Sequence, residues 1–499
     1  MTPDETATPA APTPAPAAPA AEILVESLPA AMSLAPGAGV PALGAEIILD
    51  HGLDHDGHPG VESMRAGLLQ AGPLAAAGVV ANGANVVVTV LLARLLTTHS
   101  YGVLNQLTGL FLILSMPGSA VVVAVVRRVT TWHDEGSGHL VRRWAGRIHR
   151  QGSLVVLAWG VIVFLSRHPM AVLLGQRSGI GIAAVLSAAA FFVLLSLDRG
   201  LLQARRAYRP LAANLLVEGG VRTAAVLILV AAGTGPSGAA VGIMVGEVVA
   251  AAHARWAAVR AWSEPATAGR RSWASGWLAA VRADTVLGGA DAGRRKVVLD
   301  LLIASLSLSM VAVLQNVDVL VVGRQNPSHS GAYAAVSVTS KAIVFGAIVL
   351  GGYLLPEAAI RWRQGGHALR QLAVVLSLLA IPATVLLAVA LAAPHLLLQV
   401  VFHHAYTAAA PAMAPLVVAM ILLSISVILT MYLLAVGRRW VAGVLVLGAL
   451  ALTLAEVQLR GAPRATAWAD LVVQAAVLAV IVAGFTVVHR PRLRPLQGG

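Results

Sequence analysis

Residues 371–393 read QLAVVLSLLAIPATVLLAVALAA, an apolar run without a charged side chain. As a helix, a run of about 20 such residues crosses the hydrocarbon core of a bilayer. Runs of this kind recur from Leu68 to Val488 and are separated by short loops that carry arginine. Soluble domains do not repeat apolar segments of this length, so the sequence predicts an all-α polytopic membrane protein.

The positions of these runs predict about twelve transmembrane helices in two six-helix bundles around a central cavity. An N-terminal half (65–256) is expected to hold spans at 69–94, 104–126, 152–166, 180–197, 211–232 and 238–256. A C-terminal half (297–488) is expected to hold spans at 297–322, 332–355, 371–393, 411–436, 440–457 and 466–488. The linker 257–296 carries tryptophans among arginines, which predicts an amphipathic helix along the cytoplasmic headgroup layer.

Arginine is distributed unevenly between the two sets of loops. Most arginines fall within 127–150, 199–209, 260–296, 361–370, 438–439 and 490–494. The opposite loops hold only Arg167, Arg177, Arg324, Arg460 and Arg464, with Arg94 at a helix end. Because cytoplasmic loops are enriched in arginine, both termini are expected in the cytoplasm. Arg199 is one of the residues that this pattern places in a cytoplasmic loop. Lysine is nearly absent while arginine and alanine abound, which suggests a GC-rich bacterial genome, so the membrane is expected to be a bacterial cytoplasmic (inner) membrane.

Composition excludes several other classes of protein. Hydrophobic residues make up 58% of the chain, charged residues only 11%, and cysteine is absent, so disulfides and thiol chemistry are excluded. The net charge of +13 follows from loop arginines that meet anionic lipids and does not indicate nucleic-acid binding. Without a Walker motif or a catalytic triad, the chain is not expected to be an enzyme, and no cofactor is expected.

The two ends of the chain differ from the apolar region. Residues 1–64 form an acidic Ala/Pro-rich segment, which is expected to be a disordered cytoplasmic tail, and 489–499 a second cytoplasmic tail. The first lacks the basic region of a signal peptide, and Met64 is an alternative start of translation. His51, His55 and His58 offer a metal site, but a solvated linker is the favoured interpretation, and no metal site is predicted.

Short segments along the chain resemble bacterial polysaccharide flippases. The run from Val88 to Gly102, with Ala93-Arg94-Leu95-Leu96 before Tyr101-Gly102, resembles their first-helix signature within the multidrug/oligosaccharidyl-lipid/polysaccharide exporter superfamily. Further matching segments are 198–208, 316–318 with 331–333, 355–357 and 402–406. A weak internal repeat, Asn85 to Arg94 against Asn316 to Arg324, agrees with two similarly built halves.

The resemblance implies transport of polyprenyl-pyrophosphate-linked oligosaccharide across the cytoplasmic membrane by alternating access, for cell-surface polysaccharide biosynthesis. The implied partners are the lipid-linked glycan, membrane lipids, and glycosyltransferases or a polymerase of the same pathway, with no nucleic acid. An ion-coupled multidrug exporter and a non-transporting membrane scaffold for glycan synthesis remain alternatives. In the scaffold interpretation, the acidic tail and the linker recruit cytoplasmic glycosyltransferases.

Ionisable residues inside the spans are costly and mark candidate functional positions. Lys341 lies mid-depth in the eighth span, where it is expected to bind the anionic pyrophosphate from a cavity or to belong to a buried ion pair. Arg222 follows Glu218 by one helical turn, which favours a self-neutralising pair over a substrate cation. Further candidates for substrate contact are Arg94 and Arg324 at outer helix ends, where snorkelling is the alternative. Asn85 and Asn82 share a face of the first span and are candidates to line the cavity, with helix–helix hydrogen bonding as the alternative.

Two more carboxylates belong to the candidate set. Asp318, near Gln315 and Asn316, is expected to form a salt bridge with Lys341 or Arg324, with Na⁺ or proton binding as the alternative. Glu247 in the sixth span is expected to pair with Arg222 or to couple transport to protons, and Glu218 shares these alternatives.

Overall fold

The computed structural model describes residues 76–489 apart from positions 79, 82, 86, 135–137, 177, 264–289 and 364–368. The predicted N-terminal tail with its histidines and Met64, residues 490–499, and Asn82 lie outside the described residues. So do residues 264–289 of the predicted linker, where the expected headgroup-layer helix falls.

Twelve helices of the described chain are long and apolar enough to cross a membrane, as the sequence predicts. The N-terminal half holds the first span Ala76–Leu95, then α4 (Thr98–Ser115), α5 (Pro117–Asp134), α6 (Gly138–Leu165), α7 (Arg167–Leu174), α8 (Gly179–Ala204), α9 (Tyr208–Ala231) and α10 (Gly235–Ser263). The second span combines α4 and α5, which are separated at Met116 before Pro117. Proline lacks the N–H that a continuous helix needs at that position.

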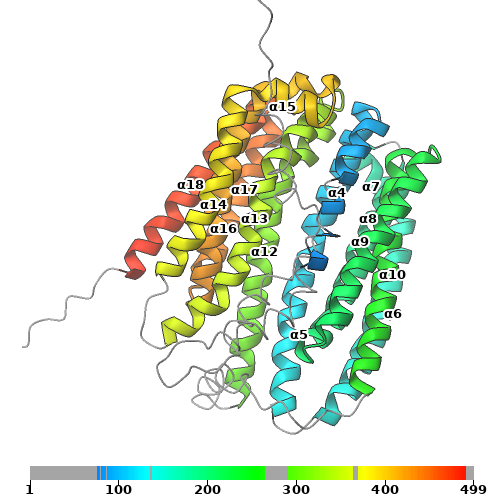
Figure 1. Cartoon of the computed structure of the whole chain (residues 1–499), viewed down its shortest axis with the longest axis vertical. Helices are drawn as coiled ribbons and strands as arrows, with labels where there is room; N and C mark the ends of the chain where they lie inside the picture. The colour runs from blue at the N-terminus through cyan, green and yellow to red at the C-terminus, as the bar shows by residue number, and fades with distance from the viewer. Residues whose placement is uncertain are drawn as a thin grey trace, which may run out of the picture.

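The C-terminal half follows after α10. It holds α12 (Ala290–Gln325), α13 (Ser330–Arg363), α14 (Leu369–Ala392), α15 (Pro394–Val401), the 3-10 helix η1 (His404–Ala412), α16 (Met413–Ala435), α17 (Trp440–Gln458) and α18 (Pro463–His489). The two halves stand side by side, with α12 and α13 of one half facing α4 and α5 of the other (Figure 1). The protein is therefore an all-α multi-pass membrane protein built from two six-span bundles.

Side-chain burial divides each helix between the protein interior and the lipid. Large apolar residues such as Leu165, Val172 and Leu447 expose about 70% of their surface (72%, 73% and 69%). Exposure of so many apolar side chains to water would be unfavourable, whereas their contact with lipid acyl chains is not. The C-terminal half has its own core around α13 and α16, and the N-terminal half packs around α8.

The third span begins several turns earlier than the predicted 152–166. In α6, Val141 and Ala145 are buried against the bundle while Arg142 and Arg143 remain exposed. The segment is thus an amphipathic extension of the span. Because this extension contains arginines, it does not stand out in the sequence as part of an apolar run.

Each half also has one short α-helix that the sequence did not predict. α7 follows the third span of the first half, and α15 follows the third span of the second. α7 ends at Gly175 in a left-handed conformation (φ 68°), and α15 starts with Pro394 in its first turn, which are favourable end signals. Their equivalent positions agree with the internal repeat.

Candidate functional site

The bundle has two ends, which the loop arginines distinguish. One end holds α7, α15 and the connecting segments 96–97 and 326–329, and we call it the arginine-poor end. We call the opposite end the arginine-rich end. The arginine-poor end is the upper one in Figure 1. Three groups of polar residues between these ends are candidates for function, one inside each half and one between the halves.

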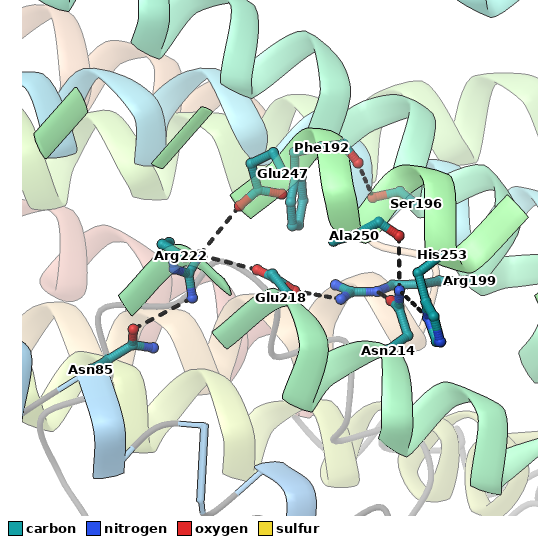
Figure 2. A network of polar contacts seen from close by, with 10 residues as sticks. All are labelled: Asn85, Phe192, Ser196, Arg199, Asn214, Glu218, Arg222, Glu247, Ala250 and His253. Carbon is teal, nitrogen blue, oxygen red and sulfur yellow. Dashed lines mark hydrogen bonds and ion pairs between the residues drawn. The ribbon is translucent and has the colours of Figure 1, made fainter. Parts of the chain in front are cut away.

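The first group is an ion network inside the N-terminal half (Figure 2). Glu218 on α9 is 2% exposed and accepts hydrogen bonds from two arginines. Arg199 on α8 donates to one carboxylate oxygen, and Arg222 donates to the other at 3.0 Å. The pair between Glu218 and Arg222 is the one that their spacing predicts. Glu218 therefore joins two guanidinium groups from different helices.

The network continues on both sides of Glu218. Arg222 also donates to Glu247 Oε1 on α10 at 3.2 Å and to Asn85 Oδ1 of the first span at 3.4 Å. Arg199 Nε donates to Asn214 Oδ1 at 2.7 Å, and Asn214 Nδ2 donates to the Ala250 carbonyl at 2.8 Å. Helices from four spans are thus linked through buried polar groups.

Charge balance gives this network a structural character. Two guanidinium groups, Arg199 and Arg222, face two carboxylates, Glu218 and Glu247, and all four side chains are buried. Mutual pairing offsets the cost of removing four charges from water. The role of Arg222 in substrate binding and the coupling roles of Glu218 and Glu247 stay predictions.

The position assigned to Arg199 was wrong. We expected it in a cytoplasmic loop, but α8 continues past it to Ala204 and its side chain is only 6% exposed. A loop was expected because Asp198 and Arg199 end the apolar run. Both are buried within the helix, because partners from neighbouring helices satisfy them. No signal in the local sequence identifies such distant partners.

The second group lies inside the C-terminal half. Lys341 Nζ on α13 lies 3.0 Å from Asp318 Oδ1 on α12. The other oxygen of Asp318 accepts from Tyr333 at 3.1 Å and from Ser337 at 2.8 Å. Of the two partners considered for Asp318, Lys341 is the one it contacts.

Two further buried carboxyl groups, Glu456 and Asp470, belong to this group and were missed by the sequence analysis. Glu456 on α17 and Asp470 on α18 are both 0% exposed and lie beside each other, and Asp470 also lies beside Tyr333. None of their four oxygen atoms has a hydrogen-bond partner within the described residues. Neither does Oε1 of the buried Gln474, one turn after Asp470 on α18.

The second group is therefore not balanced in charge. Its described members are three carboxyl groups, Asp318, Glu456 and Asp470, and one ammonium group, Lys341. Two adjacent carboxylates buried away from bulk water cannot both remain charged without a compensating cation. Glu456 and Asp470 could have been found from the sequence, because each interrupts a predicted apolar span.

The third group is a pocket between the halves. α4 of the N-terminal half contributes Asn105, Thr108 and Leu112, while α12 and α13 contribute Asn316, Lys341 and Phe345. The pocket has a volume of about 20 Å³, enough for roughly one water molecule. Lys341 thus forms an ion pair with Asp318 and also faces the interface. In this conformation the interface is nearly closed at the level of Lys341.

Contacts near the arginine-poor end join the halves. Arg94 donates to the Val400 carbonyl at 3.2 Å, and Tyr406 donates to the Ala93 carbonyl at 2.7 Å. A Cβ atom placed on Gly331 would lie 1.8 Å from the Thr98 carbonyl oxygen, so the backbones of α13 and α4 touch there. Arg94 and Arg324 are both exposed, and their roles in binding substrate stay predictions. These contacts close the interface between the halves at this end.

Within the described residues, no group of three or more His, Asp or Glu side chains is arranged to hold a metal ion. A proton needs only one bond and can be shared by two adjacent carboxyl groups.

Comparison with known proteins identifies the fold. No protein-family model and no curated protein sequence matches this chain. Among solved structures, it resembles the inward-facing conformation of a multidrug resistance MATE family transporter of the MOP superfamily. The TM-score is 0.54 at 11% identity, over 82% of this chain and 99% of that chain.

Two further solved structures extend this comparison. Lipid II flippase MurJ in an inward closed conformation gives a TM-score of 0.57 at 11% identity, over 82% of this chain and 87% of that chain. A mutant of the Vibrio cholerae MATE transporter VcmN gives 0.51 at 14% identity, over 84% of this chain and 96% of that chain. The chain therefore has the two-half fold of these membrane transporters. Such low identities show the fold alone.

Proposed function

We propose that this protein is a transporter that moves a polyprenyl-pyrophosphate-linked oligosaccharide across the bacterial cytoplasmic membrane by alternating access. The fold supports transport, because it places two similar bundles around a shared interface. The choice of cargo rests on the position of Lys341 in the pocket between the halves. Of the described residues that line the pocket between the halves, Lys341 alone is ionisable, and it is a cation.

The charge of the interface favours an anionic cargo over a cationic drug. A pyrophosphate group cannot cross hydrocarbon unaided, and an ammonium group in a site with little water attracts it strongly. The nearest carboxylate, Asp318, is 1% exposed and lies behind Lys341. Asn105, Thr108 and Asn316 supply further polar atoms that suit sugar hydroxyls.

The cargo needs the halves to separate. A pocket of about 20 Å³ is far too small for a glycan. Because the arginine-poor end is tightly joined, the halves are expected to separate first at the arginine-rich end, which positive-inside topology assigns to the cytoplasm. The glycan and pyrophosphate then enter between the halves, and the polyprenyl tail stays in lipid.

A direct comparison of cargoes tests this function. The protein is reconstituted in proteoliposomes, and flipping of a fluorescent polyprenyl-pyrophosphate oligosaccharide is measured beside transport of a cationic dye. We expect protein-dependent flipping of the lipid-linked glycan and no transport of the dye. Dye transport without glycan flipping would replace the proposal with the drug-exporter alternative.

The scaffold alternative has its own test. Deleting residues 1–63 removes the acidic tail, which lies outside the described residues. A transporter core is expected to keep its flipping rate after this deletion. If the full-length chain does not flip any lipid-linked glycan, and the deletion disrupts recruitment of glycosyltransferases, the scaffold interpretation is supported.

We further infer that transport is coupled to a proton that Glu456 and Asp470 share. This inference rests on the charge imbalance, on the complete burial of both groups and on Gln474 Oε1, which has no hydrogen-bond partner among the described residues. Protonation neutralises one carboxyl group and turns it into a hydrogen-bond donor to the other. The shared proton would then bias the packing of α17 and α18 against α12 and α13.

Imposed gradients test the coupling. A pH gradient is expected to accelerate flipping by wild-type protein, whereas Glu456→Gln and Asp470→Asn are expected to flip at one rate with or without the gradient. Asp300→Asn is the matched control, because Asp300 is a partly exposed carboxylate of α12 that pairs with Arg439. A full pH response in both cluster variants, or acceleration by Na⁺ but not by H⁺, would overturn the inference.

A further inference from the structure

A groove on the outer side of the N-terminal half lies apart from the pocket between the halves. Helices α6 and α10 both pack against α8, and the groove runs between them with α8 as its floor. Its volume is about 770 Å³. Because α6 begins and α10 ends at the arginine-rich end, the groove residues His149, Arg255 and Arg260 lie toward that end.

A buried carboxylate holds the two walls of the groove together. Asp198 on α8 is 0% exposed, and its Oδ1 accepts from Arg255 on α10 at 3.3 Å. Its Oδ2 lies 3.0 Å from His149 Nδ1 on α6. A guanidinium group has five N–H donors, so the contact with Asp198 leaves donors of Arg255 for another partner. Arg255 is therefore fixed in position and retains free hydrogen-bonding capacity.

A second arginine and a tryptophan lie on the same wall. The guanidinium carbon of Arg260 lies 5.5 Å from the centre of the Trp256 ring, and both residues line the groove. With His149 counted as neutral, Arg255, Arg260 and the carboxylate of Asp198 together leave the groove with one net positive charge. Trp256 is 58% exposed, which suits a ring at the level of lipid headgroups.

The rest of the groove is apolar. Phe191 and Leu194 form its floor on α8, and Val248, Ala252 and Val259 line the α10 wall. Val248 and Val259 are 37% and 48% exposed, so these side chains are free to contact a hydrocarbon chain. The groove thus combines two arginines toward the arginine-rich end with an apolar floor on α8.

We propose that this groove binds an anionic glycerophospholipid such as phosphatidylglycerol, with its phosphate at Arg255 and Arg260 and an acyl chain over Phe191 and Leu194. Basic pockets between helices near the membrane surface suit anionic headgroups. A zwitterionic headgroup would bring its own ammonium group toward the two arginines and lose part of the attraction. The groove opens away from the interface between the halves, so it is separate from the proposed cargo route.

The test compares lipids on the purified full-length protein. Native mass spectrometry measures retention of phosphatidylglycerol and phosphatidylethanolamine offered in equal amounts, and wild type is expected to retain the anionic lipid preferentially. Arg260→Gln is expected to reduce this retention about fivefold, because one arginine near an anionic surface contributes about 1 kcal/mol. Ala252→Phe narrows the groove without removing a charge and is expected to reduce retention as well.

Arg128→Gln is the matched control. Arg128 also lies over a tryptophan ring near the arginine-rich end, 4.3 Å from the centre of Trp132, but it does not line the groove. Its retention of phosphatidylglycerol is expected to equal that of wild type. Equal retention of both lipids by wild type, equal losses in Arg128→Gln and Arg260→Gln, or preferential retention of added polyprenyl phosphate would each overturn the proposal.

Discussion

At the scale of single residues, the described buried charges are balanced in the N-terminal half and unbalanced in the C-terminal half. The N-terminal half pairs two arginines with two glutamates, so Arg199, Arg222, Glu218 and Glu247 neutralise one another. The C-terminal half pairs Lys341 with Asp318, while the adjacent Glu456 and Asp470 have no hydrogen-bond partner for their oxygen atoms among the described residues. We therefore assign a structural task to the first network and a changeable protonation state to the second.

The balanced network predicts that Glu218→Gln destabilises the protein more than Glu247→Gln does. Glu218→Gln leaves Arg199 and Arg222 with one carboxylate fewer between them, and loss of one member of a buried ion pair costs about 3–5 kcal/mol. Glu247→Gln removes a single longer contact with Arg222, at 3.2 Å, and is expected to cost less. Thermal unfolding in detergent, followed by tryptophan fluorescence, measures both. Equal midpoints for the two variants would show that Glu218 is not the centre of the network.

Sequence reasoning found part of this site. Lys341, Asp318, Glu218, Arg222 and Glu247 stood out because ionisable residues are rare inside apolar runs. Their partners depend on which helices become neighbours, and spacing along one helix fixed only the contact between Glu218 and Arg222. Arg199 was misplaced because it follows the end of an apolar run, although buried partners hold it inside α8.

At the scale of helices, length and hydropathy predicted all twelve spans. The pattern missed α7 and α15, since eight-residue helices are too short for a periodic signal, and it shortened α6, whose first turns are amphipathic. The close packing of α10 on α9 depends on glycines at every fourth position, Gly238, Gly242 and Gly246. Small residues at this spacing allow two membrane helices to approach closely.

This packing predicts the effect of one added methyl group. A Cβ atom on Gly242 would lie 2.6 Å from the backbone nitrogen of Val226 on α9, so Gly242→Ala must push the helices apart. We expect a loss of about 1–3 kcal/mol of stability, as for overpacked cores. Gly220→Ala on α9 is the control, because nothing lies within 4 Å of that added atom. Thermal midpoints in detergent measure both, and equal midpoints would contradict close packing at Gly242.

At the scale of the whole molecule, the halves are joined at the arginine-poor end by Arg94, Tyr406 and the approach of Gly331 to Thr98. The proposed alternating access requires this closure to open once in every transport cycle. The closure is therefore expected to be a gate.

The absence of cysteine makes the gate testable, because His99→Cys with Pro327→Cys adds the chain's first two thiols. His99 Nδ1 lies 3.2 Å from the Pro327 carbonyl, across the two halves. Joining the thiols with a short bis-maleimide is expected to stop flipping, and the single variants treated with the same reagent are expected to stay active. Undiminished flipping by a fully cross-linked double variant would contradict a gate at this end.

We propose that Lys341 binds the pyrophosphate and does more than neutralise Asp318. This role is tested by lipid-linked glycan flipping in proteoliposomes by wild type, Lys341→Gln, and Lys341→Gln combined with Asp318→Asn. We predict that both variants lose about tenfold to a hundredfold in rate, because a hydrogen bond to a charged group contributes about 1.5–3 kcal/mol. The double variant contains no unpaired Asp318 charge and should still fold. If it flips the glycan at the wild-type rate, Lys341 serves only as a partner for Asp318 and the claim is wrong.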